Sequence, residues 1–323
     1  MPGEDATEQP LIPRSSAPQV WTASVAETKF YWYDLLVDGG QLPDFRDPVG
    51  RYLRRMQFAI DATMEKRLLY FLVARPRVRF DLQRSVSWGF FSLKLTIPVL
   101  IGEEERKSTI TIDLVTPFEA TYKKPLVQVQ DKFLLLNWGA LVETYTIHDL
   151  IERFNTGLAF PSTVLYVGQT FDPAGKLAKG QHGPVNRARN AKMLDSDMFL
   201  LVQRFDVKVD TAATDLSEEA SHRTHVDMLE GALIGYFEDD TSKLRTEIER
   251  GNRRDHLAGL QYTYFLEKLT VDLGFEGADA FYDLETDRAG RSRRHLFDCV
   301  FEAGRPVIAR LAENARPLPK LKG

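Results

Sequence analysis

The chain has 323 residues, a single cysteine and a formal net charge of −4 at pH 7. One cysteine excludes an internal disulfide and a zinc site built from several cysteines, and the slight negative charge excludes a general polycation, so a polyanion has to bind at local basic patches. No apolar run approaches the ~20 residues of a membrane span, and we therefore expect a cytoplasmic protein without membrane contact.

The first half of the chain predicts a tail followed by a β-rich domain. Residues 1–19 are polar and proline-rich, which is typical of a disordered tail. Residues 20–137 are predicted to form an N-terminal domain, because five of their segments are rich in Val, Ile, Thr and Phe, as strands are. One of these segments contains Trp88, Phe90 and Phe91. We expect these aromatic residues to pack in the core, and stacking on nucleic-acid bases is the alternative.

A long helix is predicted before these strands. Asp47 can cap it and Pro48 fits its first turn. Apolar residues then recur every three to four positions over residues 49–71, which predicts a helix along that stretch. Residues 45–84 carry ten basic and four acidic side chains. This surplus predicts either a polyanion-binding patch or an ordinary solvated helix face.

The middle of the chain, residues 138–247, alternates between strand and helix patterns. The stretches at 163–169 and 198–209 are apolar and rich in Val, Leu and Phe, which predicts strands. The stretch at 225–238 has apolar residues at helical spacing. Between the two strands, residues 170–192 hold five basic side chains against one acidic side chain.

The last part of the chain, residues 248–323, is predicted to be a helical C-terminal segment, because its apolar residues fit helical spacing. The whole chain is therefore predicted to be α+β. It would have a small α/β core, an N-terminal region made of a helix and an antiparallel sheet, and helices at the C-terminal end.

Four stretches in order resemble the core of the GIY-YIG nuclease superfamily: "LYVGQT", "KLAKGQHG", "MFLLVQRFDV" and "MLEGALIGYF". Tyr166-Val167-Gly168 is similar to the Tyr-Ile-Gly strand of that family, and Glu230 in "EGALIGYF" is similar to its metal-binding glutamate. His182 falls where the family's helix often carries a histidine. The resemblance covers residues 140–245 and implies a small α/β nuclease core in this region.

The resemblance also implies catalytic roles. Tyr166 and His182 would act on the attacking water and the leaving group, and Lys176 would stabilise charge on the phosphate. No Gly-Ile-Tyr stands upstream, so Tyr145 in "ETYTI" is the best candidate for the tyrosine of the first strand. Glu230 would bind Mg²⁺ or Mn²⁺ as the single protein carboxylate, because such an ion keeps most of its waters and takes phosphate oxygens as ligands.

Five further residues are predicted to contact nucleic acid. Gly168 lets the backbone approach a substrate, because it has no Cβ atom. The basic residues of the following stretch would bind phosphates: Lys179, Arg187, Arg189 and Lys192. Each predicted site residue also has a plainer interpretation, as a core tyrosine or as a charge on a solvated face.

These patterns lead to a function and two alternatives. The favoured function is a metal-dependent endonuclease that hydrolyses phosphodiester bonds, with DNA as the favoured substrate, in restriction, antiviral defence or repair. The first alternative is a catalytically inactive nucleic-acid-binding or scaffold protein that keeps the same fold. The second is a subunit that binds only proteins. In each case the N-terminal and C-terminal regions are available for a protein partner or a second copy of the chain.

Overall fold

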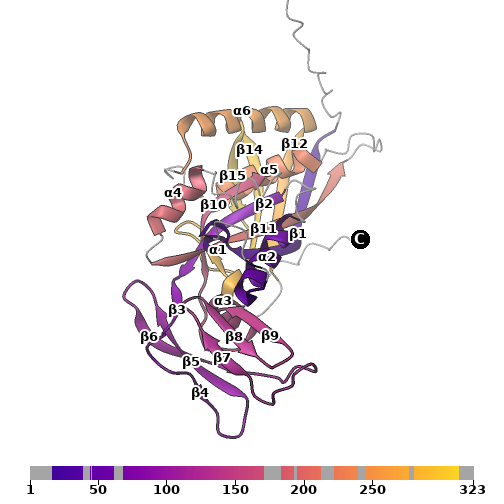
Figure 1. The fold of residues 1–323 in the computed structure, drawn as a ribbon. Helices are drawn as coiled ribbons and strands as arrows, with labels where there is room; N and C mark the ends of the chain where they lie inside the picture. Colours follow the sequence, from indigo (N-terminus) through magenta and orange to yellow (C-terminus); the bar gives the residue numbers. More distant parts are fainter. Residues whose placement is uncertain are drawn as a thin grey trace, which may run out of the picture.

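The computed structural model describes residues 17–38, 44, 46–61, 68–170, 183–192, 195–211, 222–238, 244–275 and 280–312. The chain is α+β and mostly sheet. Figure 1 shows a large sheet that carries most of the helices, and a smaller β-rich lobe that extends from one end of it. Within the described residues no helix is long and apolar enough to cross a membrane.

The large sheet has eight strands among the described residues, in the order β13-β10-β2-β11-β1-β12-β14-β15. β1–β12 and β10–β13 are parallel pairs, and the other neighbours are antiparallel. The strands are β1 (Gln19–Trp32), β2 (Leu68–Pro76), β10 (Ser162–Thr170), β11 (Ser196–Thr211), β12 (Leu266–Gly274), β13 (Leu284–Glu285), β14 (Arg294–Glu302) and β15 (Arg305–Arg310).

The helices of the described chain are α1 (Tyr33–Asp38), α2 (Pro48–Asp61), α3 (Ile147–Arg153), α4 (Gly183–Lys192), α5 (His222–Phe237) and α6 (Glu247–Tyr264), with a short 3₁₀ turn at Ala280–Tyr282. α5 packs on β2, β10 and β15, and α6 packs on α5 and on the last strands of the sheet. α4 packs on β10 and β11. Both α4 and α5 therefore lie against β10, the strand that carries the predicted Tyr-Val-Gly motif.

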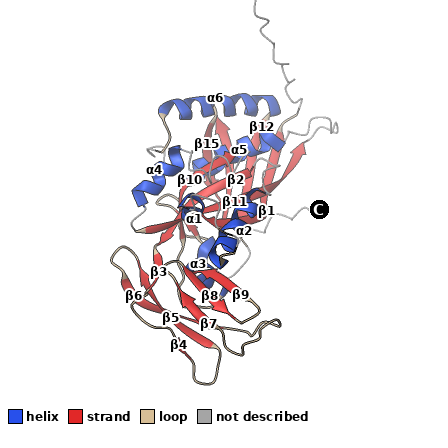
Figure 2. Cartoon of the chain, in the orientation of Figure 1, coloured by secondary structure: helices blue, strands red, loops and turns tan. Residues whose placement is uncertain are grey.

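The smaller lobe contains the strands between β2 and β10 (Figure 2). One of its sheets is formed by β3 (Val78–Phe80), β4 (Ser87–Trp88), β5 (Lys94–Ile101) and β6 (Arg106–Asp113), and the other by β7 (Leu126–Val129), β8 (Phe133–Asn137) and β9 (Val142–Thr146). α3 contacts both β3 and β9. The lobe is thus an insertion between two strands that are neighbours in the large sheet.

The position of β2 follows from its sequence. Its residues read "LLYFLVARP", and all but the last are buried. A continuous apolar run without alternation suits a strand that is covered on both faces. β2 accordingly lies between β10 and β11 and brings Tyr70 next to the predicted motif strand.

Two expectations for the N-terminal half are wrong. The predicted helix ends at Asp61, and β2 begins at Leu68, because the dense apolar run there satisfies strand spacing as well as helical spacing. The expectation that Phe90 and Phe91 pack in the core is also wrong, since their side chains are 90% and 95% exposed. They lie in the connection between β4 and β5, outside both strands.

The predicted helical C-terminal segment is wrong beyond α6. β12, β14 and β15 are strands of the large sheet, and β14 and β15 are joined by the two residues Ala303 and Gly304. Both have positive φ, +48° and +74°, as the tight turn of a two-residue hairpin requires. "FEAGRPVI" therefore encodes a hairpin, whose apolar residues also happen to fit helical spacing.

The sheet order also differs from the predicted division into domains. The large sheet mixes strands from all three predicted regions, which are 20–137, 138–247 and 248–323. The predicted tail, 1–19, lies outside the described residues up to residue 16, and Gln19 already belongs to β1. For the middle region, the predicted strands β10 and β11 and the predicted helix α5 are confirmed.

Candidate functional site

Two tyrosines meet where β10 pairs with β2. Gly168 is the register partner of Tyr70, and Tyr166 lies two residues earlier on β10. The ring centroids of Tyr70 and Tyr166 are 6.1 Å apart. Their side chains are only 1% and 5% exposed, so the pair forms part of an enclosed site.

Gly168 makes this arrangement of the two tyrosines possible. A Cβ atom at this position would lie 2.6 Å from the Tyr70 hydroxyl oxygen and 2.7 Å from the Tyr166 ring. Real Cβ atoms essentially never come that close to other atoms. The glycine of the predicted motif is therefore required by the tyrosine pair itself.

This contact predicts the effect of Gly168→Ala. The added methyl group has to push aside at least one buried ring, and overpacking of this kind typically costs about 1–3 kcal/mol. We expect a lower urea midpoint with an unchanged m-value in equilibrium unfolding. Gly290→Ala is the matched control, because a Cβ atom there meets open space. Equal stability of the Gly168→Ala and control proteins would show that the tyrosines do not pack against position 168.

The residue after the motif connects β10 to α5. The side-chain nitrogen of Gln169 donates to Asp227 and to Glu230, at 2.8 Å in each case. Asp227 and Glu230 are three residues apart on α5, so both carboxylates lie on one side of the helix. The second oxygen of Asp227 lies 3.1 Å from the Nε2 atom of His256 on α6.

Glu230 is buried in a polar rather than an apolar environment. Burial raises the pKa of its carboxyl, while the charges of Arg253 and Arg245 and the hydrogen bond from Gln169 oppose that rise. The Nη2 atom of Arg253 lies 3.8 Å from the Glu230 carboxylate. The pKa of Glu230 is nevertheless raised overall, because burial and the neighbouring Asp227 carboxylate outweigh these opposing contributions.

Arg245 is buried beside the motif strand and holds it through several polar contacts. Its guanidinium makes a two-pronged ion pair with Glu238, with both contacts at 2.7 Å, and also donates to the Tyr166 hydroxyl at 3.1 Å and to the Val167 carbonyl. Glu238 in turn accepts from the Val167 amide at 2.8 Å. The Arg245–Glu238 pair thus satisfies both backbone groups of Val167 and fixes the Tyr166 hydroxyl.

Both tyrosines are neutral phenols at physiological pH. Burial raises the pKa of Tyr70 well above 10, and the neighbouring Tyr166 and Glu230 raise it further. Burial also raises the pKa of Tyr166, although the charge of Arg245 opposes this. The pair can therefore orient a water or a phosphate oxygen through hydrogen bonds, but it does not provide a ready phenolate base.

The donor set at Glu230 is compatible with a hard divalent cation. The side-chain oxygen of Gln169 is buried and has no hydrogen-bond partner among the described residues. It lies on the same planar amide whose nitrogen donates to Asp227 and Glu230, so this oxygen faces away from both carboxylates. Amide and carboxylate oxygens are the ligands that Mg²⁺ accepts. The described residues contain no group of three or more His, Cys, Asp or Glu side chains that could hold a metal ion.

The other predicted catalytic residues are not brought to this site by the described structure. Tyr145 lies on β9 in the inserted lobe, where its hydroxyl donates to Glu143 at 3.0 Å and Arg153 lies over its ring. Burial raises its pKa to about 12. Lys176, Lys179 and His182 lie outside the described residues, and so does the side chain of Lys192 at the end of α4.

The two predicted arginines of α4 have different surroundings. Arg187 is exposed and donates to the Leu244 carbonyl at 2.9 Å, which connects α4 to the segment before α6. Arg189 forms an ion pair with Asp34 of α1 at 2.7 Å and is mostly covered. Arg187 is thus available to a ligand at the surface, whereas Arg189 already has an acidic partner.

Sequence reasoning missed Tyr70, Gln169 and Arg245. Tyr70 lies in the apolar run "LLYFLV", and the helical spacing of the preceding residues placed this position at the end of the predicted helix. Gln169 directly follows the recognised motif in "YVGQT", and its position next to the motif glycine was the available clue. Arg245 carried no sequence signal, because only the fold brings it to β10.

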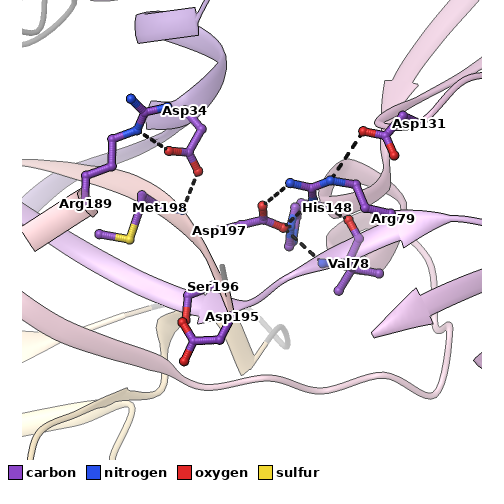
Figure 3. A network of polar contacts seen from close by, with 10 residues as sticks. All are labelled: Asp34, Val78, Arg79, Asp131, His148, Arg189, Asp195, Ser196, Asp197 and Met198. Carbon is purple, nitrogen blue, oxygen red and sulfur yellow. Dashed lines mark hydrogen bonds and ion pairs between the residues drawn. The ribbon is translucent and has the colours of Figure 1, made fainter. Parts of the chain in front are cut away.

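A second buried polar cluster lies where the inserted lobe joins the large sheet (Figure 3). Asp197 at the start of β11 accepts from the Val78 amide at 3.1 Å and contacts Arg79 at 2.8 Å and His148 at 2.7 Å. Nearby, Asp34 accepts from Arg189 and from the Met198 amide. The first group of contacts ties β3 and α3 of the lobe to β11, which indicates a structural role.

Comparisons of the chain with protein-family models, with curated proteins and with solved structures found no match.

Proposed function

We propose that this chain is a metal-dependent nuclease of the GIY-YIG type that hydrolyses phosphodiester bonds, with DNA as the favoured substrate. One observation carries the proposal. Two tyrosines from neighbouring antiparallel strands meet over Gly168, and the next residue, Gln169, contacts Glu230 on α5. In this interpretation Tyr70, rather than Tyr145, is the tyrosine of the first strand, and the lobe is inserted between the two motif strands.

The proposed chemistry uses each group according to its charge. The hydroxyls of Tyr70 and Tyr166 orient the attacking water and one phosphate oxygen, because both phenols are neutral. Arg245 holds the Tyr166 hydroxyl in position. Glu230 would hold a Mg²⁺ or Mn²⁺ ion, with waters and phosphate oxygens as the other ligands. When bound, such an ion supplies positive charge to the phosphate and to the leaving oxygen.

A non-catalytic nucleic-acid-binding protein is the second candidate, and one observation favours it. Tyr70, Tyr166 and Glu230 are all less than a tenth exposed, and the Arg245 guanidinium lies 4.2 Å above the Tyr166 ring. A phosphate reaches these groups only if the surrounding side chains move. A copy of the fold that had lost its activity would have no need for such movement.

Incubation of the purified protein with plasmid DNA separates the two candidates. The nuclease proposal expects nicked or linear plasmid with Mg²⁺ or Mn²⁺ and intact plasmid with EDTA, because the proposed reaction needs the ion. RNA is tested in parallel. Binding of either nucleic acid without cleavage under any of these conditions would favour the non-catalytic candidate.

Tyr70 and Tyr145 are the two candidates for the tyrosine of the first motif strand, and a separate prediction distinguishes them. Tyr70→Phe removes one hydroxyl from the proposed site and should slow cleavage by about two decades, the usual contribution of a positioned acid–base group. Tyr145→Phe should leave the rate unchanged, because its hydroxyl contacts Glu143 within the lobe. Thermal melting of both variants checks that they fold. The opposite ranking of the two rates would return Tyr145 to the active site.

A further inference from the structure

A basic pocket of about 540 Å³ lies between α5, α6 and the β14–β15 hairpin. Its lining includes one acidic residue, Glu247, and five arginines among the residues that the structure describes. The arginines are Arg250, Arg253, Arg254, Arg288 and Arg305. We call this feature the arginine pocket.

The arginines of the pocket come from three separate segments. Arg250, Arg253 and Arg254 have i, i+3 and i+4 spacing on α6, which places them on one side of that helix. Arg288 lies in the turn region before β14, and Arg305 is the first residue of β15. Positive charge therefore faces the pocket from more than one side. On an ordinary solvated helix face, the charges would all come from one helix.

Glycines fix the walls of the pocket close to one another. A Cβ atom on Gly235 of α5 would lie 2.5 Å from Pro306, and one on Gly231 would lie 2.6 Å from Leu257 of α6. At the hairpin turn, a Cβ atom on Gly304 would lie 1.9 Å from the Arg254 carbonyl. The hairpin is therefore packed directly on α5 and α6, so the arginines are held on a rigid frame.

Acidic partners balance only part of this charge, and one of them is Glu230, which lies 3.8 Å from Arg253. Glu247 pairs with Arg250 at 2.9 Å, but its side chain is 89% exposed. Arg254 has only a contact of 3.9 Å with Asp255. For Arg305 no ion pair is present among the described residues. Clustered guanidinium groups create a positive potential that favours an anion, and their planar donors match phosphate oxygens in particular.

The pocket adjoins the candidate active site. Arg253 lines the pocket and also lies 3.8 Å from Glu230, and Gly231 of the pocket wall follows Glu230 on α5. We propose that the arginine pocket binds backbone phosphates of the nucleic-acid strand whose cleaved phosphate lies at Glu230. This inference rests on the proposed function, and it assigns strand binding to α6 and the C-terminal hairpin.

The lining of the pocket favours a strand over a free nucleotide. Nucleotide and cofactor pockets are lined mainly by hydrophobic and aromatic side chains that hold the base. The described lining of the arginine pocket includes no aromatic side chain. Its contacts would therefore be made to phosphates, which position a strand without reading its sequence.

The test uses the double variant Arg254→Gln/Arg305→Gln, because both side chains are exposed and weakly paired. Affinity for a short labelled DNA duplex is measured in EDTA over a range of salt concentrations. Each lost phosphate contact should lower the slope of log affinity against log salt by about 0.9, so the double variant should lose about 1.8 units. Arg106→Gln/Arg223→Gln is the control, because both arginines are exposed and neither lines the pocket.

The outcomes separate this proposal from the proposed function. A smaller slope and weaker binding for the pocket variant alone support strand binding, even if the wild type cuts no DNA. An unchanged slope overturns it, even if the wild type is an active nuclease. A wild-type melting temperature that rises with inorganic phosphate at constant ionic strength, combined with an unchanged slope for the pocket variant, also overturns it in favour of a free-anion site.

Discussion

Glu230→Gln should abolish Mg²⁺-dependent cleavage while leaving DNA binding intact. The amide is nearly isosteric with the carboxylate, so it still fits beside Gln169, but it loses the negative charge that would hold the ion. Loss of the main metal carboxylate removes several kcal/mol of transition-state stabilisation, which corresponds to roughly three or more decades in rate. The rate is measured by single-turnover cleavage, and the affinity by fluorescence anisotropy in EDTA.

Glu267→Gln is the matched control for this prediction. Glu267 is exposed at the start of β12, and the same chemical change there should leave the cleavage rate unchanged. Thermal melting checks that Glu230→Gln folds. A folded Glu230→Gln protein that cuts as fast as the wild type would show that Glu230 is structural, and the proposed metal site would then be wrong.

The part of the site that could be predicted lies in one continuous region of the sequence. Tyr166, Gly168 and Glu230 were identified because their strand and helix lie close together in the chain, with only α4 and β11 as described elements between them. Tyr70 was not identified, because the whole inserted lobe separates it from β10 in the chain. Pairing between β2 and β10 is a long-range contact, and no local spacing rule predicts which distant apolar run supplies the neighbour.

The C-terminal strands show a different limit. β14 and β15 contain apolar residues that satisfy both strand and helical spacing, so periodicity alone cannot decide between the two. The deciding feature is the turn at Ala303 and Gly304, which needs two residues with positive φ. The arginine pocket could not be predicted for the same reason, because it depends on this hairpin packing against α6.

The Asp197 cluster predicts the largest effect on stability. Burial alone would raise the pKa of Asp197, but hydrogen bonds from His148 and Arg79 and the positive charge of Arg79 outweigh it and lower this pKa to about 2. Burial lowers the pKa of His148, which stays neutral and donates to Asp197. The native state therefore keeps one buried negative charge whose partners come from the inserted lobe.

The acid dependence follows from the direction of this shift. An unfolded chain protonates aspartate near pH 3.9, whereas native Asp197 does so only near pH 2. The stabilisation is thus fully present above about pH 4 and is lost as the pH falls towards 2. Its size is about 2–3 kcal/mol, from about two pKa units at 1.36 kcal/mol each.

Asp197→Asn should destabilise the protein by about 3–5 kcal/mol at pH 7, the usual cost of removing one partner from a buried ion pair. Arg79 would lose its close acidic contact and keep the Val78 carbonyl, at 2.6 Å, and the more distant Asp131 carboxylate, at 3.5 Å. Urea unfolding measures the loss, and Asp113→Asn is the control, because that side chain is exposed and its lysine contact is 3.7 Å. The free energy of unfolding of the variant should also fall less steeply between pH 4 and 2 than that of the wild type, because the variant lacks the Asp197 carboxyl. Equal stability of the Asp197→Asn and control proteins at pH 7 would contradict the assignment of Asp197 as the joint between lobe and sheet.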